Sequence, residues 1–311
     1  MNGRDWLDAS RLRTLPLAAA CVMVGGAVAF TDAQIDPAIS DRFWPVFVGV
    51  LCTVFGLQIL SNWANDLGDS ENGADGPERL DRAVASGRIS PQAMKQAVKG
   101  LGVVVLVSGV GTVVMALQGT ELLLPAVVLI LLGIAGMVAA YRYTAGKNPY
   151  GYVGLGDLAV FLFFGWIGVA GTAFLLSHTW TWAWLLPGTL TGALSVAVLN
   201  LNNMRDFKSD EAAGKRTLVV RIGWKKARRY QAVCFILAWT SWWCFCLVIE
   251  PGQWRGSHWI FALSLLHVAH LIRVFQTTDP QALDPELKRV ALSTALVALF
   301  LLLSQTQSLP V

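Results

Sequence analysis

Long apolar runs separated by polar loops constrain this chain more than any other feature of its sequence. A helix of about 20 apolar residues spans the hydrocarbon core of a bilayer. Charged residues make up only 14% of the chain, well below the ~25% of soluble domains. The sequence therefore predicts an all-α, polytopic membrane protein whose residues 1–311 form one domain. The predicted spans are Leu15–Phe30, Phe43–Asn62, Gly100–Leu117, Leu122–Tyr141, Leu155–Leu176, Trp180–Leu201, Gln231–Ile249, Trp259–Val274 and Val290–Leu303, the last being the shortest.

The basic residues are distributed unevenly between the two sides of this predicted bundle. Of the 24 Lys and Arg residues, all but Arg42 and Arg255 lie before the first span or in and beside the loops that nine spans place on the same side. Loops rich in Lys and Arg stay in the cytoplasm. We therefore expect the N-terminus and these basic loops to be cytoplasmic, and the C-terminus to lie across the membrane.

Two clusters of acids and amides follow the second and the sixth span. Carboxylates at this spacing share one face of a helix if the helix continues through them. A solvated helix end with capping acids would explain one cluster, but two matched clusters on the same side indicate two half-sites that face each other. The clusters are Asn62, Asp66 and Asp69 in the first case and Asn202, Asp206 and Asp210 in the second.

Carboxylates this close to lipid need a neutralising partner. A hard divalent cation takes oxygen ligands, and Mg²⁺ that bridges carboxylates to a phosphate is the common biological form. Cations in the adjoining loops complete a diphosphate site, and an apolar bundle beneath it suits a lipid tail. The sequence thus predicts transfer or hydrolysis of an isoprenyl diphosphate. The predicted diphosphate ligands are Arg82, Arg205, Lys215 and Arg216.

Three further polar residues lie near or inside the spans. Asp157 stands just inside the fifth span, where ionisable residues are functional by default. It either orients or deprotonates a hydroxyl of an acceptor, or it pairs with Lys147 or an arginine, and the sequence leaves both options open. His267 and His270 lie three residues apart, and packing between helices is favoured over a metal or haem role for them.

The second cluster matches the motif NxxxDxxxD in full, and four further segments of the chain resemble those of a known protein family. On these residues the chain resembles the UbiA-type intramembrane aromatic prenyltransferases, and most of all the bacterial 1,4-dihydroxy-2-naphthoate prenyltransferases of menaquinone synthesis. The first cluster departs from the motif, because Ser70 stands where the family has its second acid and Asp69 comes one residue early. The segments are Arg13–Pro16, Ser61–Asp69, Asn148–Asp157 and Gly214–Gly223.

The resemblance implies nine helices around a central cavity that opens sideways to lipid. It implies a Mg²⁺-dependent transfer of a polyprenyl group from polyprenyl diphosphate to 1,4-dihydroxy-2-naphthoate, with loss of CO2 and diphosphate. The product is demethylmenaquinone. The expected location is the bacterial inner membrane, with the active site facing the cytoplasm and no nucleic-acid partner. By segment match, the resemblance assigns catalytic roles to Lys147, Tyr150 and Asp157.

Other functions remain to be weighed at this point. Within the same enzyme class, the acceptor could be another aromatic compound such as 4-hydroxybenzoate. A transporter or channel would place ionisable groups near the middle of the membrane, whereas the acids here lie at one face. For the departure at Ser70, we expect Asp69 to bind or water-bridge the metal, with Gly68 loosening the last helical turn.

Overall fold

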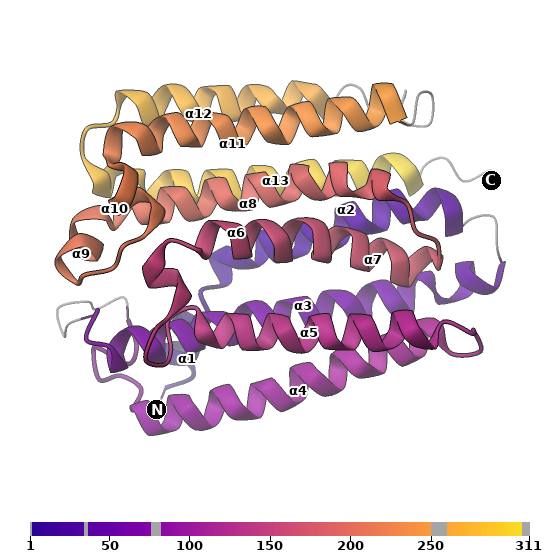
Figure 1. Cartoon of the computed structure of the whole chain (residues 1–311), viewed down its shortest axis with the longest axis horizontal. Helices are drawn as coiled ribbons and strands as arrows, with labels where there is room; N and C mark the ends of the chain where they lie inside the picture. The colour runs from indigo at the N-terminus through magenta and orange to yellow at the C-terminus, as the bar shows by residue number, and fades with distance from the viewer. Residues whose placement is uncertain (1, 34–36, 76–81, 250–259, 307–311) are drawn as a thin grey trace.

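The computed structural model consists of long helices that run nearly parallel to one another (Figure 1). It describes residues 2–33, 37–75, 82–249 and 260–306, and among these no β-strand occurs. The main helices are α2 (Leu15–Ala33), α3 (Pro37–Glu71), α4 (Pro91–Leu117), α5 (Leu123–Arg142), α7 (Gly168–Ser177), α8 (Leu185–Arg205), α11 (Trp224–Cys244), α12 (Ser264–Gln276) and α13 (Asp284–Thr306). The short helices are α1 (Gly3–Ser10), α6 (Gly156–Val160), α9 (Phe207–Ala212) and α10 (Leu218–Ile222). Short 3-10 turns lie at Leu12–Thr14, Tyr150–Val153, Trp182–Trp184 and Pro280–Leu283, and π-helical segments at Phe161–Ile167 and Phe245–Ile249.

Within these residues, eight helical segments are long and apolar enough to cross a membrane, rather than the nine expected. The segment Ile260–Gln276 is apolar but shorter than the others. The last span is longer than predicted, because α13 already begins at Asp284. The sequence analysis, which looked for apolar runs, missed this first turn because the turn carries charged residues. Glu286 in this turn is buried and paired with Arg273 and Arg289.

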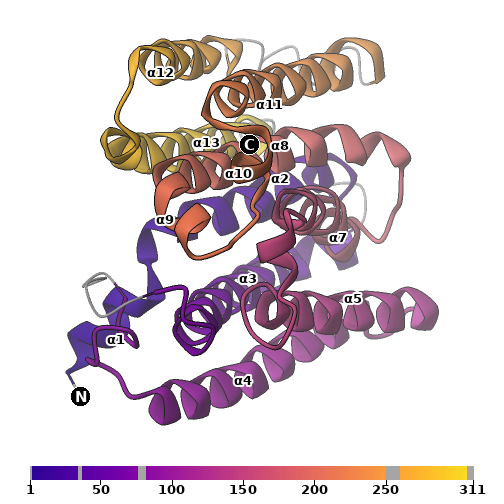
Figure 2. The same cartoon turned by 60° about the vertical axis from the view of Figure 1, so that its left-hand side comes forward.

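The loops predicted to share one side do lie at the same end of the bundle. Figure 1 shows α1, α9 and α10 together at its left-hand end, where α3 also leads into the loop before α4. Figure 2 brings this end forward, with α9 and α10 above and α1 below. The prediction that both acidic clusters lie at the same end of the bundle agrees with this arrangement.

Residues 82–90, which precede α4, are folded against the bundle. Ser90 caps α4 by accepting a hydrogen bond from the backbone of Ala93, and Pro91 occupies the first helical turn, as its sequence predicts. Ile89 and Met94 are fully buried against Leu67 of α3. This packing fixes the backbone just after Arg82, beside the first acidic cluster.

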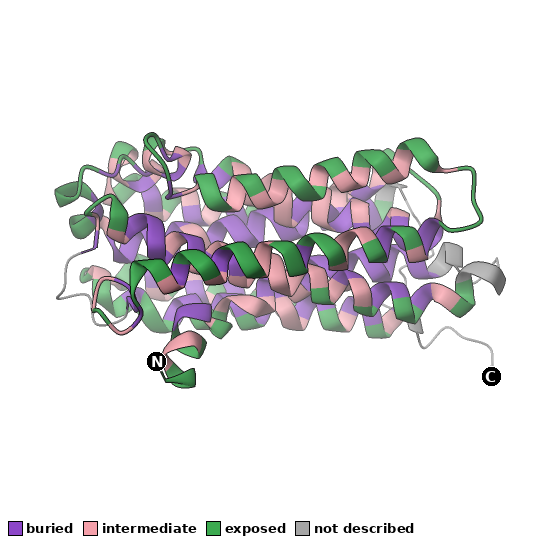
Figure 3. Ribbon diagram, turned by 90° about the horizontal axis from the view of Figure 1, so that it is seen from below, coloured by how far each residue is buried: buried purple, intermediate pink, exposed green. Residues whose placement is uncertain are grey.

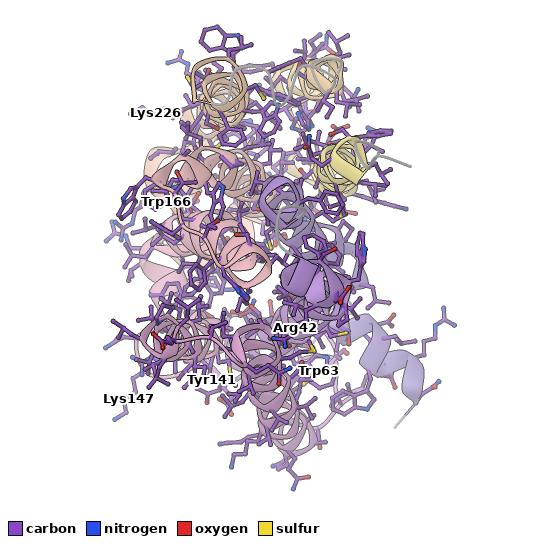
Figure 4. All side chains as sticks on the ribbon, turned by 90° about the vertical axis from the view of Figure 1, so that its right-hand side faces the viewer. Arg42, Trp63, Tyr141, Lys147, Trp166 and Lys226 are labelled. Atoms are coloured by element: carbon purple, nitrogen blue, oxygen red, sulfur yellow. The ribbon has the colours of Figure 1, made fainter. Side chains whose placement is uncertain are left out.

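Close glycine packing joins the fifth and sixth spans. A Cβ at Gly165 would lie 2.7 Å from the carbonyl oxygen of Gly188 and 3.0 Å from the Cα of Gly192. Small residues of this kind let membrane helices approach closely. Gly165 lies in the π-helical segment, which directs Phe163 and Phe164 into the interior, whereas Trp166 lies at the edge of the bundle (Figure 4).

The two histidines belong to a buried polar network between α11, α12 and α13. His267 accepts a hydrogen bond from the indole of Trp239 and contacts Ser293 with its other ring nitrogen. His270 contacts Glu286 at 2.5 Å and Gln231 at 3.2 Å. All four ring nitrogens have protein partners, which supports the packing role.

Candidate active site

The two acidic clusters meet at the ammonium group of one lysine. Lys215 Nζ lies 2.9 Å from Asp69 Oδ1 and 4.0 Å from Asp210 Oδ1. Asp69 belongs to α3 and Asp210 to α9, so residues 141 positions apart in the chain share a single cation. The hypothesis of two facing half-sites agrees with this arrangement.

Helix α3 carries the first cluster on one continuous helical face. Asn62 donates hydrogen bonds to the carbonyl oxygen of Ser10 at 2.9 Å and to the Thr14 hydroxyl at 3.1 Å, which attaches the N-terminal segment to the site. Asp66 Oδ2 accepts from the backbone N–H of Ala83 at 3.0 Å. Its Oδ1 is buried without a hydrogen-bond partner. One carboxylate oxygen in the cluster thus remains available to a ligand.

Asp69 is held by groups from three other segments. Its Oδ1 accepts a hydrogen bond from the Tyr152 hydroxyl at 2.7 Å as well as from Lys215. Its Oδ2 lies 3.7 Å from Arg82 Nη2, and Arg82 Nε is 3.1 Å from Asp75. Buried carboxylates and cationic side chains therefore alternate here. Such an arrangement can bind a metal cation and an anionic group side by side.

Gly68 has a different role from the one expected. Helix α3 continues regularly to Glu71, and the N–H of Asn72 still bonds to the Gly68 carbonyl oxygen at 3.0 Å. A Cβ at Gly68 would lie 2.7 Å from the backbone of Thr144. The glycine thus allows the loop after α5 to approach α3, and the expected loosening of the last turn was wrong.

The second cluster spans a break between α8 and α9. Helix α8 ends at Arg205, and Asp206 has backbone angles outside the helical region before α9 begins. Arg205 forms two 2.9 Å hydrogen bonds to its neighbour Asp206 and donates another to Asn202 Oδ1. Its remaining nitrogen reaches Asp284 of α13 at 2.7 Å. The guanidinium thus ties Asn202 of α8 and the neighbouring Asp206 to the start of the last span.

A cavity of about 950 Å³ opens between these clusters and extends into the bundle. Its polar end is formed by the acids and their cations, including Asp75 and Arg88. Its deeper part is apolar and reaches Val113 and Leu175. Charged and apolar surfaces in one continuous cavity suit a ligand with an anionic head and a hydrocarbon tail.

The structure places four of the predicted site residues outside the cavity wall. Asp66 lies just behind it, with its free oxygen buried. Lys147 is exposed and lies at the periphery of the bundle in Figure 4, and Arg216 is exposed as well. Asp157 is buried close to Tyr230 of α11, and its Oδ1 has no hydrogen-bond partner. The exposed positions of Lys147 and Arg216 therefore do not support a contact of either residue with a bound diphosphate.

The other nine predicted residues do line the cavity. Tyr150 is among them, and its ring packs edge-on against Tyr143 with centroids 5.4 Å apart. Burial raises the pKa of Tyr150 to about 12. Burial, together with the nearby Asp69 carboxylate, also raises the pKa of Tyr152. Both phenols are therefore protonated at neutral pH, and Tyr152 is a hydrogen-bond donor to Asp69. The nine are Asn62, Asp69, Asn202, Asp206, Asp210, Arg82, Arg205, Lys215 and Tyr150.

Sequence reasoning missed Arg11 as a site residue. Arg11 lines the cavity in the left-handed backbone conformation, with φ of 45°, which is uncommon for a residue other than glycine. Its Nη2 is buried without a hydrogen-bond partner, and its charge interacts with Asp66 and Asp69. The only signal was its place two residues before the segment Arg13–Pro16.

Comparisons with known proteins agree with this architecture. The profile of the UbiA prenyltransferase family matches residues 18–297. This chain belongs to the UbiA prenyltransferase family. It is 39% identical over 301 residues to 1,4-dihydroxy-2-naphthoate octaprenyltransferase of Escherichia coli (strain K12), covering 96% of this chain and 94% of that protein. It is 36% identical over 268 residues to the protein of the same name in Mycobacterium tuberculosis (strain ATCC 25618 / H37Rv), covering 81% and 85%.

The family fold is also seen in a solved structure of a UbiA homolog from Archaeoglobus fulgidus, bound to GPP and Mg²⁺. That structure matches with a TM-score of 0.61 at 16% identity, and the match covers 96% of this chain and 99% of the other. At this identity the likeness establishes the fold. Family membership identifies the cavity and its two acidic clusters as the candidate prenyltransferase site.

The residues present fit a hard divalent cation. Carboxylate and amide oxygens are the ligands that Mg²⁺ prefers, and Asp66 Oδ1 is a buried oxygen in need of a partner. In the described part of the chain, no three His, Cys, Asp or Glu side chains form a group that could hold a metal by themselves. The amides of Asn62 and Asn202, or oxygens of a substrate, are therefore needed to complete the coordination.

Proposed function

We propose that this prenyltransferase joins a polyprenyl group to 1,4-dihydroxy-2-naphthoate, with loss of CO2 and diphosphate, to give demethylmenaquinol, the reduced form of demethylmenaquinone. The observation that carries this proposal is the identity of 39% to a protein named for this reaction, over nearly the full length of both chains. The cavity supports it independently, because a charged end and an apolar interior match the head and the tail of a polyprenyl diphosphate.

The cations at the polar end would bind the diphosphate. Lys215, Arg82 and Arg11 all line the cavity and are balanced here by Asp69 and Asp75. Their charges neutralise the negative charge that grows on the diphosphate as the allylic C–O bond breaks. Arg205 is held by three side chains at once, so it is oriented before any substrate arrives.

The two clusters would hold Mg²⁺, which supplies further neutralisation of the leaving diphosphate when bound. The candidate ligands are the six residues of the two clusters. Asp66 offers its free Oδ1, whereas Asp69 and Asp206 are engaged by Lys215 and Arg205. When a diphosphate binds, Lys215 and Arg205 would turn toward it and leave Asp69 and Asp206 available to the metal ion. The charges within the site would then remain balanced.

The aromatic acceptor would lie at the boundary between the polar and apolar parts of the cavity. Tyr143 and Tyr150 line this region and present ring edges and protonated hydroxyls. Phe163 and Phe164 line the apolar part deeper in the bundle, where ring faces can stabilise an allylic cation. Asp157 lies behind this wall, so any influence on the acceptor would pass through neighbouring residues.

We further propose that the site faces the cytoplasm of a bacterial cell. The basic loops and the acidic clusters lie at the same end of the bundle, and such loops remain in the cytoplasm. Reporter fusions after Lys147 and after Gln305 test this orientation. A cytoplasmic signal at Lys147 and an external signal at Gln305 are expected, and the reverse pattern would refute it.

The decisive experiment is an assay of the purified protein with octaprenyl diphosphate, Mg²⁺ and a panel of aromatic acceptors. We expect demethylmenaquinol from 1,4-dihydroxy-2-naphthoate, detected by mass spectrometry as demethylmenaquinone after oxidation in air, and no product in EDTA. Prenylated 4-hydroxybenzoate as the main product would assign a different acceptor. Absence of transfer to any acceptor, with Mg²⁺ present, would contradict the proposal.

A further inference from the structure

Gln58 carries the polar face of α3 one turn further into the cavity. It lies one helical turn before Asn62, and both side chains line the cavity. Toward the interior, α3 presents mostly apolar side chains to the same cavity, among them Val50, Val54 and Leu57. Gln58 therefore stands at the boundary between the first acidic cluster and the apolar part of the cavity.

The hydroxyl of Thr14 holds the amides of both Gln58 and Asn62. Thr14 Oγ1 donates its single proton to the carbonyl oxygen of Arg11 at 2.9 Å. It accepts hydrogen bonds from Gln58 Nε2 at 3.0 Å and from Asn62 Nδ2 at 3.1 Å. A hydroxyl has one donor and two acceptor positions, so every position of Thr14 is used.

These contacts fix which end of each amide points toward Thr14. The carbonyl oxygen of Ser10 also faces Asn62 Nδ2, at 2.9 Å, and a carbonyl can only accept. The amide of Gln58 directs a second N–H toward Asn62 Oδ1, in a long contact of 3.4 Å. If either amide were reversed, its oxygen would face other acceptors and these hydrogen bonds would be lost.

This network uses all its donors and leaves acceptor oxygen unused. Both N–H groups of each amide have acceptors, as does the Thr14 hydroxyl. Within the described residues, no group donates a hydrogen bond to Gln58 Oε1. Because Gln58 lines the cavity, this oxygen is available to a ligand. That ligand has to bring a hydrogen-bond donor or a cation.

An aromatic hydroxyl fits this oxygen better than a metal ion or a diphosphate does. Asp66 and Asp69 lie roughly 12 and 16 Å further along α3, at about 1.5 Å per residue, so a cation held by Asp69 is beyond the reach of Gln58. An ionised diphosphate offers only acceptor oxygens and can donate no hydrogen bond. The proposed aromatic acceptor, by contrast, carries two hydroxyl groups on its ring.

We propose that Gln58 Oε1 accepts a hydrogen bond from a ring hydroxyl of the aromatic acceptor, and that Thr14 is the positioning residue that orients the Gln58 amide for this contact. This inference rests on the proposed function. The allylic cation bonds to a ring carbon beside a hydroxyl-bearing carbon, so positive charge spreads to the hydroxyl oxygen. The hydroxyl then becomes a better donor, and its contact with Gln58 is stronger in the transition state than in the bound substrate.

The N-terminal segment that carries Thr14 has a second attachment to the bundle. Figure 3 shows the N-terminal end of the chain outside the long helices, with exposed residues at its start. Ala9 and Ser10 are buried, and the Ser10 hydroxyl accepts a hydrogen bond from the indole of Trp63 at 3.1 Å. This attachment does not involve the Thr14 hydroxyl, so a substitution that removes the hydroxyl should leave the segment in place.

The first test compares Gln58→Met with Gln118→Met, which alters an exposed residue at the end of α4. Gln58→Met keeps the length of the side chain and removes both polar atoms. We expect kcat/KM for 1,4-dihydroxy-2-naphthoate to fall about thirtyfold, as loss of one partner of a buried hydrogen bond does. The Mg²⁺ concentration for half-activity should not change, and Gln118→Met should change neither value.

Acceptor analogues identify the hydroxyl that is recognised. 1-Hydroxy-2-naphthoate and 4-hydroxy-2-naphthoate each lack one hydroxyl, and their inhibition constants are measured in Gln58→Met and in the unaltered protein. The analogue that keeps the recognised hydroxyl should bind Gln58→Met about tenfold more weakly. The other analogue should bind Gln58→Met at least as well as it binds the unaltered protein. Equal changes for the two analogues would overturn the proposal.

The second test removes the hydroxyl that orients the amides. In Thr14→Val, the inhibition constant of the hydroxyl-bearing analogue and the Mg²⁺ concentration for half-activity should both rise about fivefold, because both amides lose one partner. Thr14→Ser should restore both values. Thr294→Val is the matched control, since the buried Thr294 hydroxyl also donates to a backbone carbonyl but lies outside the cavity wall.

The outcomes separate this inference from the proposed function. A changed Mg²⁺ requirement in Gln58→Met, with unchanged acceptor constants, would overturn the inference and make Gln58 part of the metal site. If the unaltered protein prenylates 4-hydroxybenzoate instead of the naphthoate, the proposed acceptor fails. Gln58 is then tested by the binding of 4-hydroxybenzoate and 4-methoxybenzoate, and only the first should bind Gln58→Met more weakly.

Discussion

Two buried polar regions of this protein differ in how completely their hydrogen bonds are satisfied. In the network of α11, α12 and α13, both ring nitrogens of His267 and His270 have partners, and Glu286 accepts from Arg273, Arg289 and His270. At the acidic clusters, by contrast, Asp66 Oδ1 and Arg11 Nη2 are buried without partners.

This difference separates a structural role from a ligand-binding role. Buried polar groups in native structures are nearly always paired, and each exception needs an explanation. An unpaired carboxylate oxygen just behind the cavity wall and an unpaired guanidinium nitrogen of the cavity-lining Arg11 are explained by a ligand that carries a cation and an anion together. The histidine network has no such need, so it holds helices together. Substitutions in the two regions should therefore fail in different ways.

The largest effect is expected from Asp66→Asn and Asp206→Asn. Each removes a negative charge from one acidic cluster while keeping the side-chain shape, so activity should fall about a thousandfold, which corresponds to about 4 kcal/mol. Initial rates at saturating Mg²⁺ and thermal unfolding would be measured together. Asp41→Asn, in the exposed first part of α3, is the control. Activity above a tenth of normal in either variant would contradict the two-cluster site.

Glu286→Gln should act on stability instead. It removes the charge that faces Arg273 and Arg289, and breaking a buried ion pair in this way costs about 3 kcal/mol. We expect a lower thermal unfolding midpoint and an unchanged Mg²⁺ concentration for half-activity of the folded fraction. Glu121→Gln, at an exposed turn, should leave both unchanged. A shift in the Mg²⁺ requirement would place Glu286 in the catalytic region.

Arg11→Gln should weaken donor binding. Loss of a charge-assisted contact to a diphosphate costs about 2 kcal/mol, or roughly a thirtyfold rise in KM for the polyprenyl diphosphate. Arg11→Lys should recover part of the loss. Arg4→Gln, on the exposed face of α1, is the matched control. If KM stays constant while stability falls, Arg11 serves only to fix the N-terminal segment.

The smallest effect is expected from Tyr152→Phe, which removes one hydrogen bond to Asp69. A bond to a charged group is worth about 1.5 kcal/mol, so the Mg²⁺ concentration for half-activity should change about tenfold. Because burial and Asp69 raise the pKa of Tyr152, the phenol stays protonated through pH 9. The pH profile between 7 and 9 should thus be the same in both proteins. Tyr141→Phe, outside the cavity wall, is the control.

The sequence alone determined the helices, their order and the two acidic clusters. These features depend on local properties, namely the length of apolar runs and the spacing of Asn62, Asp66 and Asp69 along one helix face. The positive-inside pattern also grouped the correct loops at one end. It could not predict that α13 begins at Asp284, because paired charges inside a helix look polar in sequence.

Only the tertiary structure decided which basic residues belong to the site. Lys215 and Arg216 are neighbours in sequence, yet Lys215 is buried between Asp69 and Asp210 whereas Arg216 is exposed. Arg11 enters the cavity through a left-handed turn that no motif specifies. A side chain's charge is a local property, but its partners come from distant segments. Their meeting depends on the packing of α1, α3 and α9, which the spacing of residues along the chain does not encode.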